Sequence, residues 1–556
     1  MCKGSICLKH FQKIGAFFMK FYGFLSVDYW LLTIDLCRLI HYFYFCGDDV
    51  TYNLMKNKAF QIFFSLAFLL CLSYIELSAK VVLPKIFSDN MVLQRESKVN
   101  LWGTADANST VTLTASWSKT AVTAKADTQG KWKATIQTPT AGGPYSMTFN
   151  DESNKNQKSM VKSQQSKIEN ILIGEVWICA GQSNMEMPMK GFKNQPVENA
   201  VQDILHSNDA DLRLFTVKRT SSFLPKDDVQ GEWRLSGPES VREFSATAYY
   251  FGKELRQMLG VPVGLICTAW GGSACEAWMT ADWLRAFPNV KIPQTESDIK
   301  SKNRTPTVLY NGMLSPLVGY TMRGAIWYQG EDNVPRFQTY AEMMTAMVKG
   351  WRSVWQQGNF PFYYCQIAPY DYSLVNMKPN SALLREQQAK AEQMIPNCGM
   401  AVLMDCGMEL GIHPRKKHLA GLRLALLALD NTYDVKGLTS KSAYYKGMSI
   451  SNDTCTVSFE RADMWIYGEK GYMSECFELA GADKVFHPAK AVVERSKVIV
   501  TCDKVKQPVA VRYAFKDWVQ GDLYCDGIPV SSFRSDDWDI DLSEANKPAI
   551  DYDKQR

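Results

Sequence analysis

Hydrophobic and polar residues alternate with a period of two over residues 80–167. Val111, Leu113 and Ala115, for example, alternate with threonines, and the same pattern returns after a Gln-Gly turn signal. Because successive side chains of a strand point to opposite faces, this alternation predicts strands with one buried face. We therefore expect a small β-sandwich-like domain over 80–167, with a role in packing or glycan contact. A polar stretch at 151–169 has the composition of a linker.

Short apolar runs alternate with longer helical patterns over residues 168–435. Such an order predicts a mostly parallel sheet covered by helices on both faces. Ligands bind such sheets beyond the carboxyl ends of the strands, so chemistry is expected in the loops that follow the runs. The apolar runs are 175–179, 263–267, 325–328, 362–367 and 401–404, and the helical candidates are 248–259, 340–355, 381–394 and 416–429.

Residues 436–556 return to strand-like segments separated by turn signals, among them 456–459, 497–501 and 509–515. We expect a third, β-rich domain there. The predicted fold class is thus an α/β core flanked by N-terminal and C-terminal β-rich segments.

The amino-terminal region has the pattern of an export signal. Basic residues at 55–58 precede an apolar stretch at 59–75 and a small-residue site that ends at Ala79. This order predicts a signal peptide at 55–79 and an exported protein, periplasmic or extracellular, without stable membrane insertion after cleavage. The alternative is a transmembrane anchor. Residues 1–54 are interpreted as a mis-assigned or non-structural extension, with Met55 as the true start.

The composition excludes several classes of protein. A chain of 556 residues with a formal net charge of +5 has no concentrated basic patch, which argues against a nucleic-acid partner. The 15 cysteines show neither metal-ligand spacing nor a paired pattern. No His-Glu-x-x-His motif is present, so a catalytic metal is not expected.

The loop after the first apolar run contains a candidate nucleophile. Ser183 follows Gly181 by two positions at a strand-to-helix turn, where a serine can present its hydroxyl and its backbone N–H to a substrate carbonyl. The alternative interpretation is that Ser183 caps the next helix. The pattern also differs from the Gly-x-Ser-x-Gly elbow, because Met185 occupies the position of the second glycine.

A serine nucleophile needs a base, and His413 is the best candidate by position. It lies in a glycine-punctuated loop after the last apolar run, at the expected carboxyl edge of the sheet. His418 lies at the start of the following helix, where capping or solvation is its alternative role. Two loops could supply donors to an oxyanion, namely 270–273 and 329–333, although either could be a plain turn.

These motifs together resemble the sialate O-acetylesterase family of SGNH-type hydrolases. The likeness extends from residue 81 to about 538. The matching segments are 174–177, 181–185, 244–246, 251–255, 262–266, 270–272, 327–331, 412–414, Lys417, Gly421 and 423–425 in the core, and 91–95, 511–514, 527–529 and 533–534 outside it.

The resemblance implies removal of O-acetyl groups from sialic acids or other acetylated sugars through a serine acetyl-enzyme, without a cofactor. It assigns Ser183 as nucleophile and His413 as base. It also assigns the backbone N–H groups of Ser183 and Gly272 and the side chain of Gln329 to the oxyanion hole. Two alternatives remain open: an acetylesterase of plant polysaccharides such as xylan or pectin, and a glycan-binding protein with a decayed catalytic core.

One departure from the family concerns the acid that orients the histidine. Relatives often have aspartate two residues before the histidine, where this chain has Gly411. The nearby candidates for the acid are Asp405 and Glu409, and a backbone carbonyl is a third possibility.

Overall fold

The structure is a computed structural model that describes residues 81–151, 166–372, 381–462 and 465–540. The predicted extension at 1–54, the predicted signal peptide at 55–79 and most of the predicted linker lie outside the described residues. Within the described ranges, no helix has both the length and the apolar character needed to cross a bilayer.

The centre of the molecule is a sheet whose strands follow the order β13-β12-β11-β7-β10-β8-β9. Every neighbouring pair is parallel except β8 and β9. The predicted mostly parallel sheet is thus confirmed. Its strands are β7 (Ser166–Gly181), β8 (Asp209–Thr216), β9 (Trp233–Ser236), β10 (Val263–Ala269), β11 (Gly324–Tyr328), β12 (Phe362–Cys365) and β13 (Cys398–Ala401).

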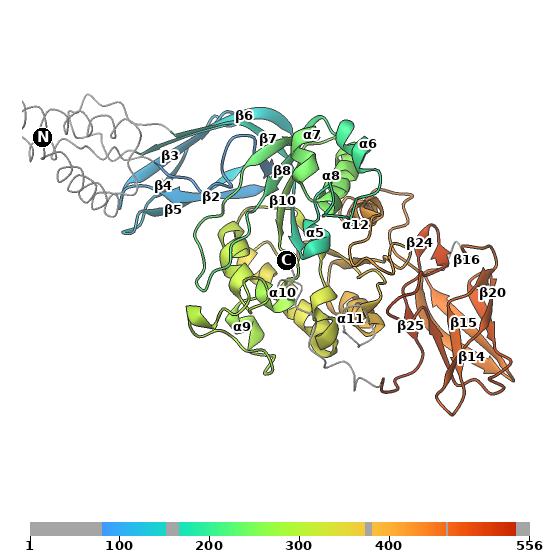
Figure 1. The fold of residues 1–556 in the computed structure, drawn as a ribbon. Coiled ribbons are helices and arrows are strands. Elements are labelled where there is room, and N and C mark those ends of the chain that lie inside the picture. Colours follow the sequence, from blue (N-terminus) through green and yellow to red (C-terminus); the bar gives the residue numbers. More distant parts are fainter. Residues whose placement is uncertain (1–80, 152–165, 373–380, 463–464, 541–556) are drawn as a thin grey trace, which may run out of the picture. The chain divides into compact units, whose positions relative to one another are not determined.

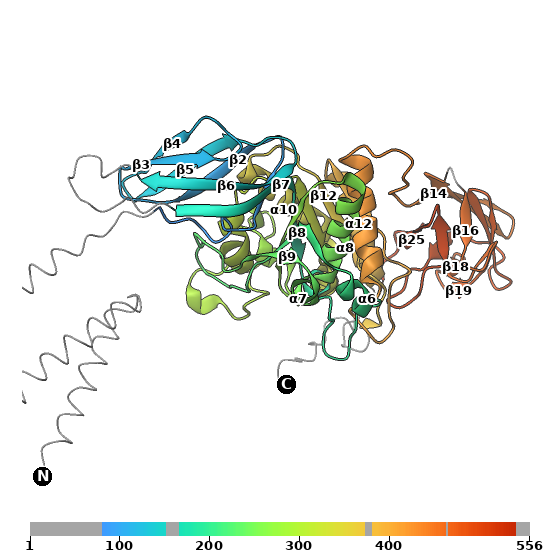
Figure 2. The same ribbon diagram turned by 90° about the horizontal axis from the view of Figure 1, so that it is seen from above.

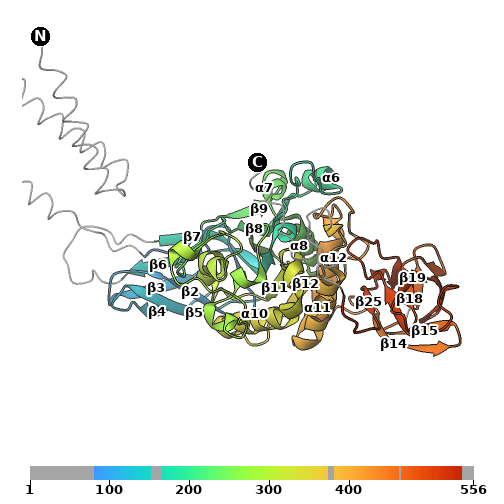
Figure 3. The same cartoon turned by 60° about the horizontal axis from the view of Figure 1, so that its bottom comes forward.

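Helices cover both faces of this sheet, because successive side chains of β7 enter two different cores. Trp177 and Cys179 pack with α8 (Ala246–Leu259) and α12 (Lys417–Asn431), which lie side by side in Figure 2. Ile178 points to the other face, where α10 (Tyr340–Trp355) and α11 (Ser381–Met394) contribute to the core, as Figure 3 shows.

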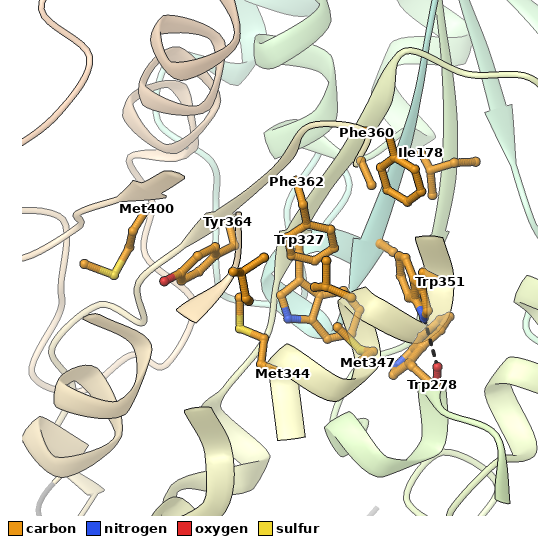
Figure 4. Close-up of a cluster of buried hydrophobic side chains, with 14 of the residues drawn as sticks. Ile178, Trp278, Trp327, Met344, Met347, Trp351, Phe360, Phe362, Tyr364 and Met400 are labelled. Carbon is orange, nitrogen blue, oxygen red and sulfur yellow. Dashed lines mark hydrogen bonds between the residues drawn. The ribbon is translucent and has the colours of Figure 1, made fainter. Parts of the chain in front are cut away.

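Aromatic and sulfur side chains fill the core under α10 (Figure 4). Trp351 of α10 lies edge-on to Trp327 of β11, with ring centroids 5.8 Å apart. Its indole N–H donates a hydrogen bond of 3.2 Å to the carbonyl of Trp278. This hydrogen bond offsets the cost of burying the indole N–H of Trp351, so this large side chain can fix α10 against the sheet.

The predicted helices agree closely with the observed ones, whereas one predicted strand is too long and another is displaced. α10 and α11 have the predicted bounds. β12 ends at Cys365, where its ladder with β13 stops, so the predicted strand at 362–367 is too long, and β13 lies at Cys398–Ala401 rather than at the predicted 401–404. The other helical segments are α5 (Ser183–Glu186), α6 (Ala200–Leu205), α7 (Pro238–Glu243), α9 (Ala281–Leu284), η1 (Cys275–Trp278), η2 (Glu296–Asp298), η3 (Tyr310–Leu314), η4 (Ser315–Leu317) and η5 (Glu331–Thr339).

The N-terminal β-rich segment shares strand β7 with the core. The first half of β7 pairs with β6 and β1, and its second half pairs with β10 and β11. β7 begins at Ser166, just before the predicted domain boundary at residues 167 and 168. The strands of this segment are β1 (Val92–Gln94), β2 (Lys98–Thr104), β3 (Thr110–Ala115), β4 (Val122–Lys125), β5 (Lys131–Gln137) and β6 (Gly142–Asp151).

The C-terminal segment is β-rich, as predicted, and its strands form three antiparallel sheets within the described residues. They are coloured orange to red in Figure 1. The strands are β14 (Tyr444–Ser451), β15 (Thr454–Glu460), β16 (Ile466–Gly468), β17 (Met473–Ser474), β18 (Phe477–Ala480), β19 (Phe486–Pro488), β20 (Lys490–Glu494), β21 (Lys497–Thr501), β22 (Ala510–Tyr513), β23 (Leu523–Cys525), β24 (Ile528–Pro529) and β25 (Phe533–Arg534).

Candidate active site

Ser183 lies immediately beyond the carboxyl end of the central strand, as the first residue of the short helix α5. The strand ends at Gly181, whose φ is 146° and where a Cβ would stand 2.2 Å from the carbonyl oxygen of Tyr328. Only glycine fits this close approach of β7 to β11. The side chain of Ser183 is partly exposed, so a substrate can reach it.

Two neighbouring loops are tied to the Ser183 loop. The side-chain oxygen of Gln182 accepts hydrogen bonds from the backbone N–H groups of Gly330 (3.2 Å) and Asp332 (3.4 Å). On the other side, Glu186 accepts a hydrogen bond of 2.7 Å from the N–H of Gly271. The loops that sequence analysis selected as possible oxyanion donors are therefore attached to the Ser183 loop.

The backbone N–H groups of Ser183 and Gly272 have no hydrogen-bond partner among the described residues. A methyl group added at Gly271 would lie 3.3 Å from the Cβ of Ser183, so this glycine turn packs directly on the serine. Gly272 has a φ of 65°, in the left-handed region that favours glycine. Two free N–H groups on adjoining loops are the kind of donor that an oxyanion hole requires.

Gln329 has a different environment from the one that the resemblance implies. Its side-chain nitrogen donates to the carbonyl of Ser273 (3.1 Å) and to the side-chain oxygen of Asn333 (2.7 Å), and the residue is fully buried. A primary amide has two N–H donors, so neither remains for an oxyanion in this structure. Gln329 instead fixes the turn that contains Gly272.

His413 lies in the loop before α12, with a partly buried side chain. Its Nδ1 forms a hydrogen bond with the side-chain oxygen of Gln195, and the ring of Phe192 lies edge-on at 5.0 Å between ring centroids. Burial, and secondarily the charge of Lys417, lower the pKa of His413 to about 4. The imidazole is therefore neutral, as a general base must be, over most of the pH range.

Asn184 joins the serine loop to the histidine loop. Its side-chain nitrogen donates a hydrogen bond of 3.1 Å to the carbonyl of Ile412, the residue before His413. The structure thus brings the two loops into contact through the neighbours of Ser183 and His413, without a hydrogen bond between the serine hydroxyl and the imidazole. In ligand-free enzymes such bonds are often long and tighten only when substrate binds.

Neither candidate acid contacts His413. The carboxylate of Asp405 forms a two-pronged pair with Arg423, at 2.6 and 2.7 Å. Burial alone would raise the pKa of Asp405, but this pair holds it below its usual value. Glu409 is exposed to solvent. The acids were chosen for their proximity in sequence, whereas the fold directs one to an arginine and the other to water.

A buried polar network lies beneath the serine and histidine loops. Lys417, which is 1% exposed, donates a hydrogen bond of 2.5 Å to the side-chain oxygen of Asn184. The amide nitrogen of Asn184 donates in turn to Glu331, at 2.5 Å. Burial lowers the pKa of Lys417 to about 7 and raises that of Glu331.

Sequence reasoning assigned no role to Gln195 or Asn184. Asn184 adjoins the nucleophile within a matching motif, a signal that could have identified it. Gln195 lies in an irregular loop without any motif. Within the described ranges, no group of three or more His, Cys, Asp or Glu side chains could hold a metal ion.

The comparison with solved structures defines the class of protein. A carbohydrate acetylesterase from Xanthomonas citri superposes with a TM-score of 0.73 and 34% sequence identity, covering 83% of this chain and 100% of that chain. The predicted SGNH-like α/β fold is thereby confirmed as that of a carbohydrate esterase.

Sequence comparisons specify the family. A family model described as carbohydrate esterase, sialic acid-specific acetylesterase, matches residues 173–420. The sialate O-acetylesterase of Homo sapiens is 29% identical over 389 residues, covering 63% of this chain and 71% of the human protein. That of Rattus norvegicus is 26% identical over 501 residues, covering 78% and 89%. The likeness to the solved acetylesterase places the chain among the carbohydrate esterases, and its residues 173–420 match the sialic acid-specific acetylesterase model.

Proposed function

We propose that this protein removes O-acetyl groups from sialic acids or other acetylated sugars, with Ser183 as nucleophile and His413 as general base. The observation that carries the proposal is the meeting of the two loops. Asn184 and Ile412, the neighbours of the two residues, are hydrogen-bonded at the carboxyl end of the sheet. Family membership supports the reaction class.

In the proposed reaction, Nε2 of His413 takes the proton of the Ser183 hydroxyl while the oxygen attacks the acetyl carbonyl carbon. The N–H groups of Ser183 and Gly272 donate hydrogen bonds to the oxyanion that forms. Loss of one such donor typically costs about 10²–10³ in rate. The imidazolium then gives its proton to the ester oxygen of the sugar as the bond from that oxygen to the acetyl carbon breaks, which releases the sugar hydroxyl and leaves the acetyl group on Ser183.

The second half of the reaction repeats the same proton transfers with water. Neutral His413 takes a proton from a water molecule, whose oxygen attacks the acetyl-enzyme carbonyl. Collapse of the tetrahedral intermediate releases acetate and returns the proton to the Ser183 oxygen. The chain's own residues supply every proton transfer, so the proposed reaction uses no cofactor.

We also infer that the protein is exported, to the periplasm or the extracellular space. The inference depends on the signal-like order of basic, apolar and small residues at 55–79. Mass spectrometry of the mature N-terminus from the natural host tests it. A mature chain that begins at Lys80 supports export with cleavage, whereas retention of 55–79 supports the anchor alternative.

Acetate release from a substrate panel tests the function. Wild-type protein and Ser183→Ala are compared on O-acetylated sialic acid, acetylxylan and acetylated pectin. We expect turnover by the wild type, greatest on one class of sugar, and loss of at least about a thousandfold in Ser183→Ala. Preference for acetylxylan or pectin would favour the plant-polysaccharide alternative. No turnover by the wild type on any sugar ester would favour the decayed, glycan-binding alternative.

A further inference from the structure

The loop that follows the nucleophile contacts the candidate base, His413, through two of its side chains. Phe192 and Gln195 exchange two backbone hydrogen bonds, each 3.0 Å long, which form an isolated bridge. Both of their side chains contact the imidazole of His413, one through a ring edge and the other through a hydrogen bond to Nδ1. We name Phe192 and Gln195 the bridge pair.

The bridge pair is fixed by contacts on both sides. Before the bridge pair, the N–H of Met189 donates a hydrogen bond of 2.9 Å to the carbonyl of Phe244. After the bridge pair, the N–H of Glu198 donates a hydrogen bond of 3.0 Å to the carbonyl of Arg415, two residues beyond His413. Gly191 has a φ of 80°, and a Cβ there would lie 2.3 Å from the carbonyl oxygen of Gln195. The position of the bridge pair relative to His413 is therefore built into the fold.

We propose that Gln195 is the positioning residue that replaces the missing acid of the catalytic site, holding His413 through its Nδ1. This inference rests on the proposed function of His413 as base. An amide oxygen accepts hydrogen bonds and cannot donate them, so Nδ1 must carry the proton. Nε2 then keeps its lone pair, the form that a base toward Ser183 requires.

A neutral amide fixes the tautomer without stabilising the positive charge that forms during catalysis. Among the described residues, the charged group that acts on the His413 ring is Lys417, and its charge opposes protonation. An aspartate in place of Gln195 would favour the imidazolium, whereas glutamine does not. The absence of a carboxylate is consistent with the lowered pKa of His413.

Two substitutions separate positioning from simple packing. Gln195→Leu removes the acceptor and should lower kcat about 10- to 100-fold with little change in KM, because the correct tautomer is no longer selected. Gln195→Glu places a carboxylate beside Nδ1 of His413. It should keep activity at neutral pH and move the acid limb of the kcat/KM profile upward by about one pH unit or more. Lys193→Ala, on the exposed turn between the bridge pair, is the matched control and should behave as wild type.

Nitrogen NMR of histidine-labelled protein gives a readout that does not depend on turnover. The His413 signals are assigned by their loss in His413→Asn. We expect a protonated Nδ1 in the wild type and a shift toward the Nε2-protonated tautomer in Gln195→Leu. A wild type with Nε2 protonated, or a tautomer unchanged in Gln195→Leu, would overturn the role of Gln195. If Ser183→Ala retains activity, the proposed function fails, while the NMR result still decides the contact.

Discussion

The half of β7 that pairs with β10 and β11 has a buried charged cluster near each of its ends. The two clusters differ in how completely their charged groups are paired. Near the start of this half, the fully buried carboxylate of Glu175 is surrounded by donors. Burial alone would raise the pKa of Glu175, but the hydrogen bonds from two arginines and Gln94 and the charge of Arg323 lower it. The donors to Glu175 are Arg95 (2.5 Å), Arg323 (2.7 and 3.1 Å), Gln94 (3.0 Å) and the hydroxyl of Tyr433 (2.9 Å).

Beyond the other end of β7, the charges of Lys417 and Glu331 do not meet directly. The amide of Asn184 separates them, and one oxygen of Glu331 has no partner among the described residues. Burial therefore destabilises the charged form of both groups. We infer that the Glu175 cluster stabilises the sheet, whereas the Lys417–Glu331 cluster positions the serine and histidine loops at a cost in stability, as functional sites often do.

The largest expected effect concerns the base. His413→Ala should lower kcat about 10²–10⁴-fold, the typical contribution of a general base, without a comparable loss of stability. Rates of acetate release and thermal unfolding measure the two quantities. The matched control is His418→Ala, whose ring lies 6.1 Å from that of Tyr250. An equal loss of activity in both variants would contradict the distinction between the two histidines.

Glu175→Gln should affect stability rather than chemistry. Breaking a buried ion pair leaves its partners without compensation, at about 3–5 kcal/mol, and the partial exposure of Arg95 and Arg323 reduces this to about 2–4 kcal/mol. Urea unfolding measures the loss, and kcat of the folded protein should stay at the wild-type value. If Glu175→Gln had the wild-type midpoint of urea unfolding but a reduced kcat, the assignment of a stabilising role to the Glu175 cluster would be wrong.

Asp405 was considered as a catalytic acid from the sequence, but we expect its role to resemble that of Glu175, which stabilises the fold through buried ion pairs. Asp405→Asn breaks its pair with Arg423, in which both side chains are buried, and should cost about 3–5 kcal/mol of stability. We expect kcat within about threefold of wild type and an unchanged pH profile, because no contact joins Asp405 to His413. A large fall in kcat with an altered acid limb would restore Asp405 as the orienting acid.

The smallest expected effect comes from Lys417, whose charge lowers the pKa of His413 in addition to burial. The proposed reaction requires neutral His413, so activity should be lost as the pH falls through the pKa of His413. Lys417→Met removes the opposing charge, so the pKa should rise and the acid limb should move to higher pH, by less than about one unit. Lys416→Met is the control. A limb that stays in place, or moves to lower pH, would show that the two groups are not coupled.

The sequence predicted those features that depend on local periodicity. The helices at 340–355 and 381–394 were predictable because their apolar positions repeat at helical spacing. The continuity of β7 across the predicted boundary was not, because its first residues are polar and pair with β6 rather than with the core.

The candidate site was predictable only in part. Ser183 and His413 follow apolar runs, so their place at the sheet edge could be inferred. Gln195 could not be identified, because a neutral amide in an irregular loop leaves no sequence signal until the fold places it against the imidazole. The partner of Asp405 was equally hidden, since Arg423 lies 18 residues away on α12.

The most direct test of the account is the reaction of the protein with a fluorophosphonate probe, followed by peptide mapping. Only a serine activated by a base reacts readily with such a reagent. We expect a label on Ser183, loss of esterase activity in proportion to labelling, and much slower labelling in His413→Ala. Full labelling of Ser183 without loss of activity, or inactivation with the label on another residue, would contradict it.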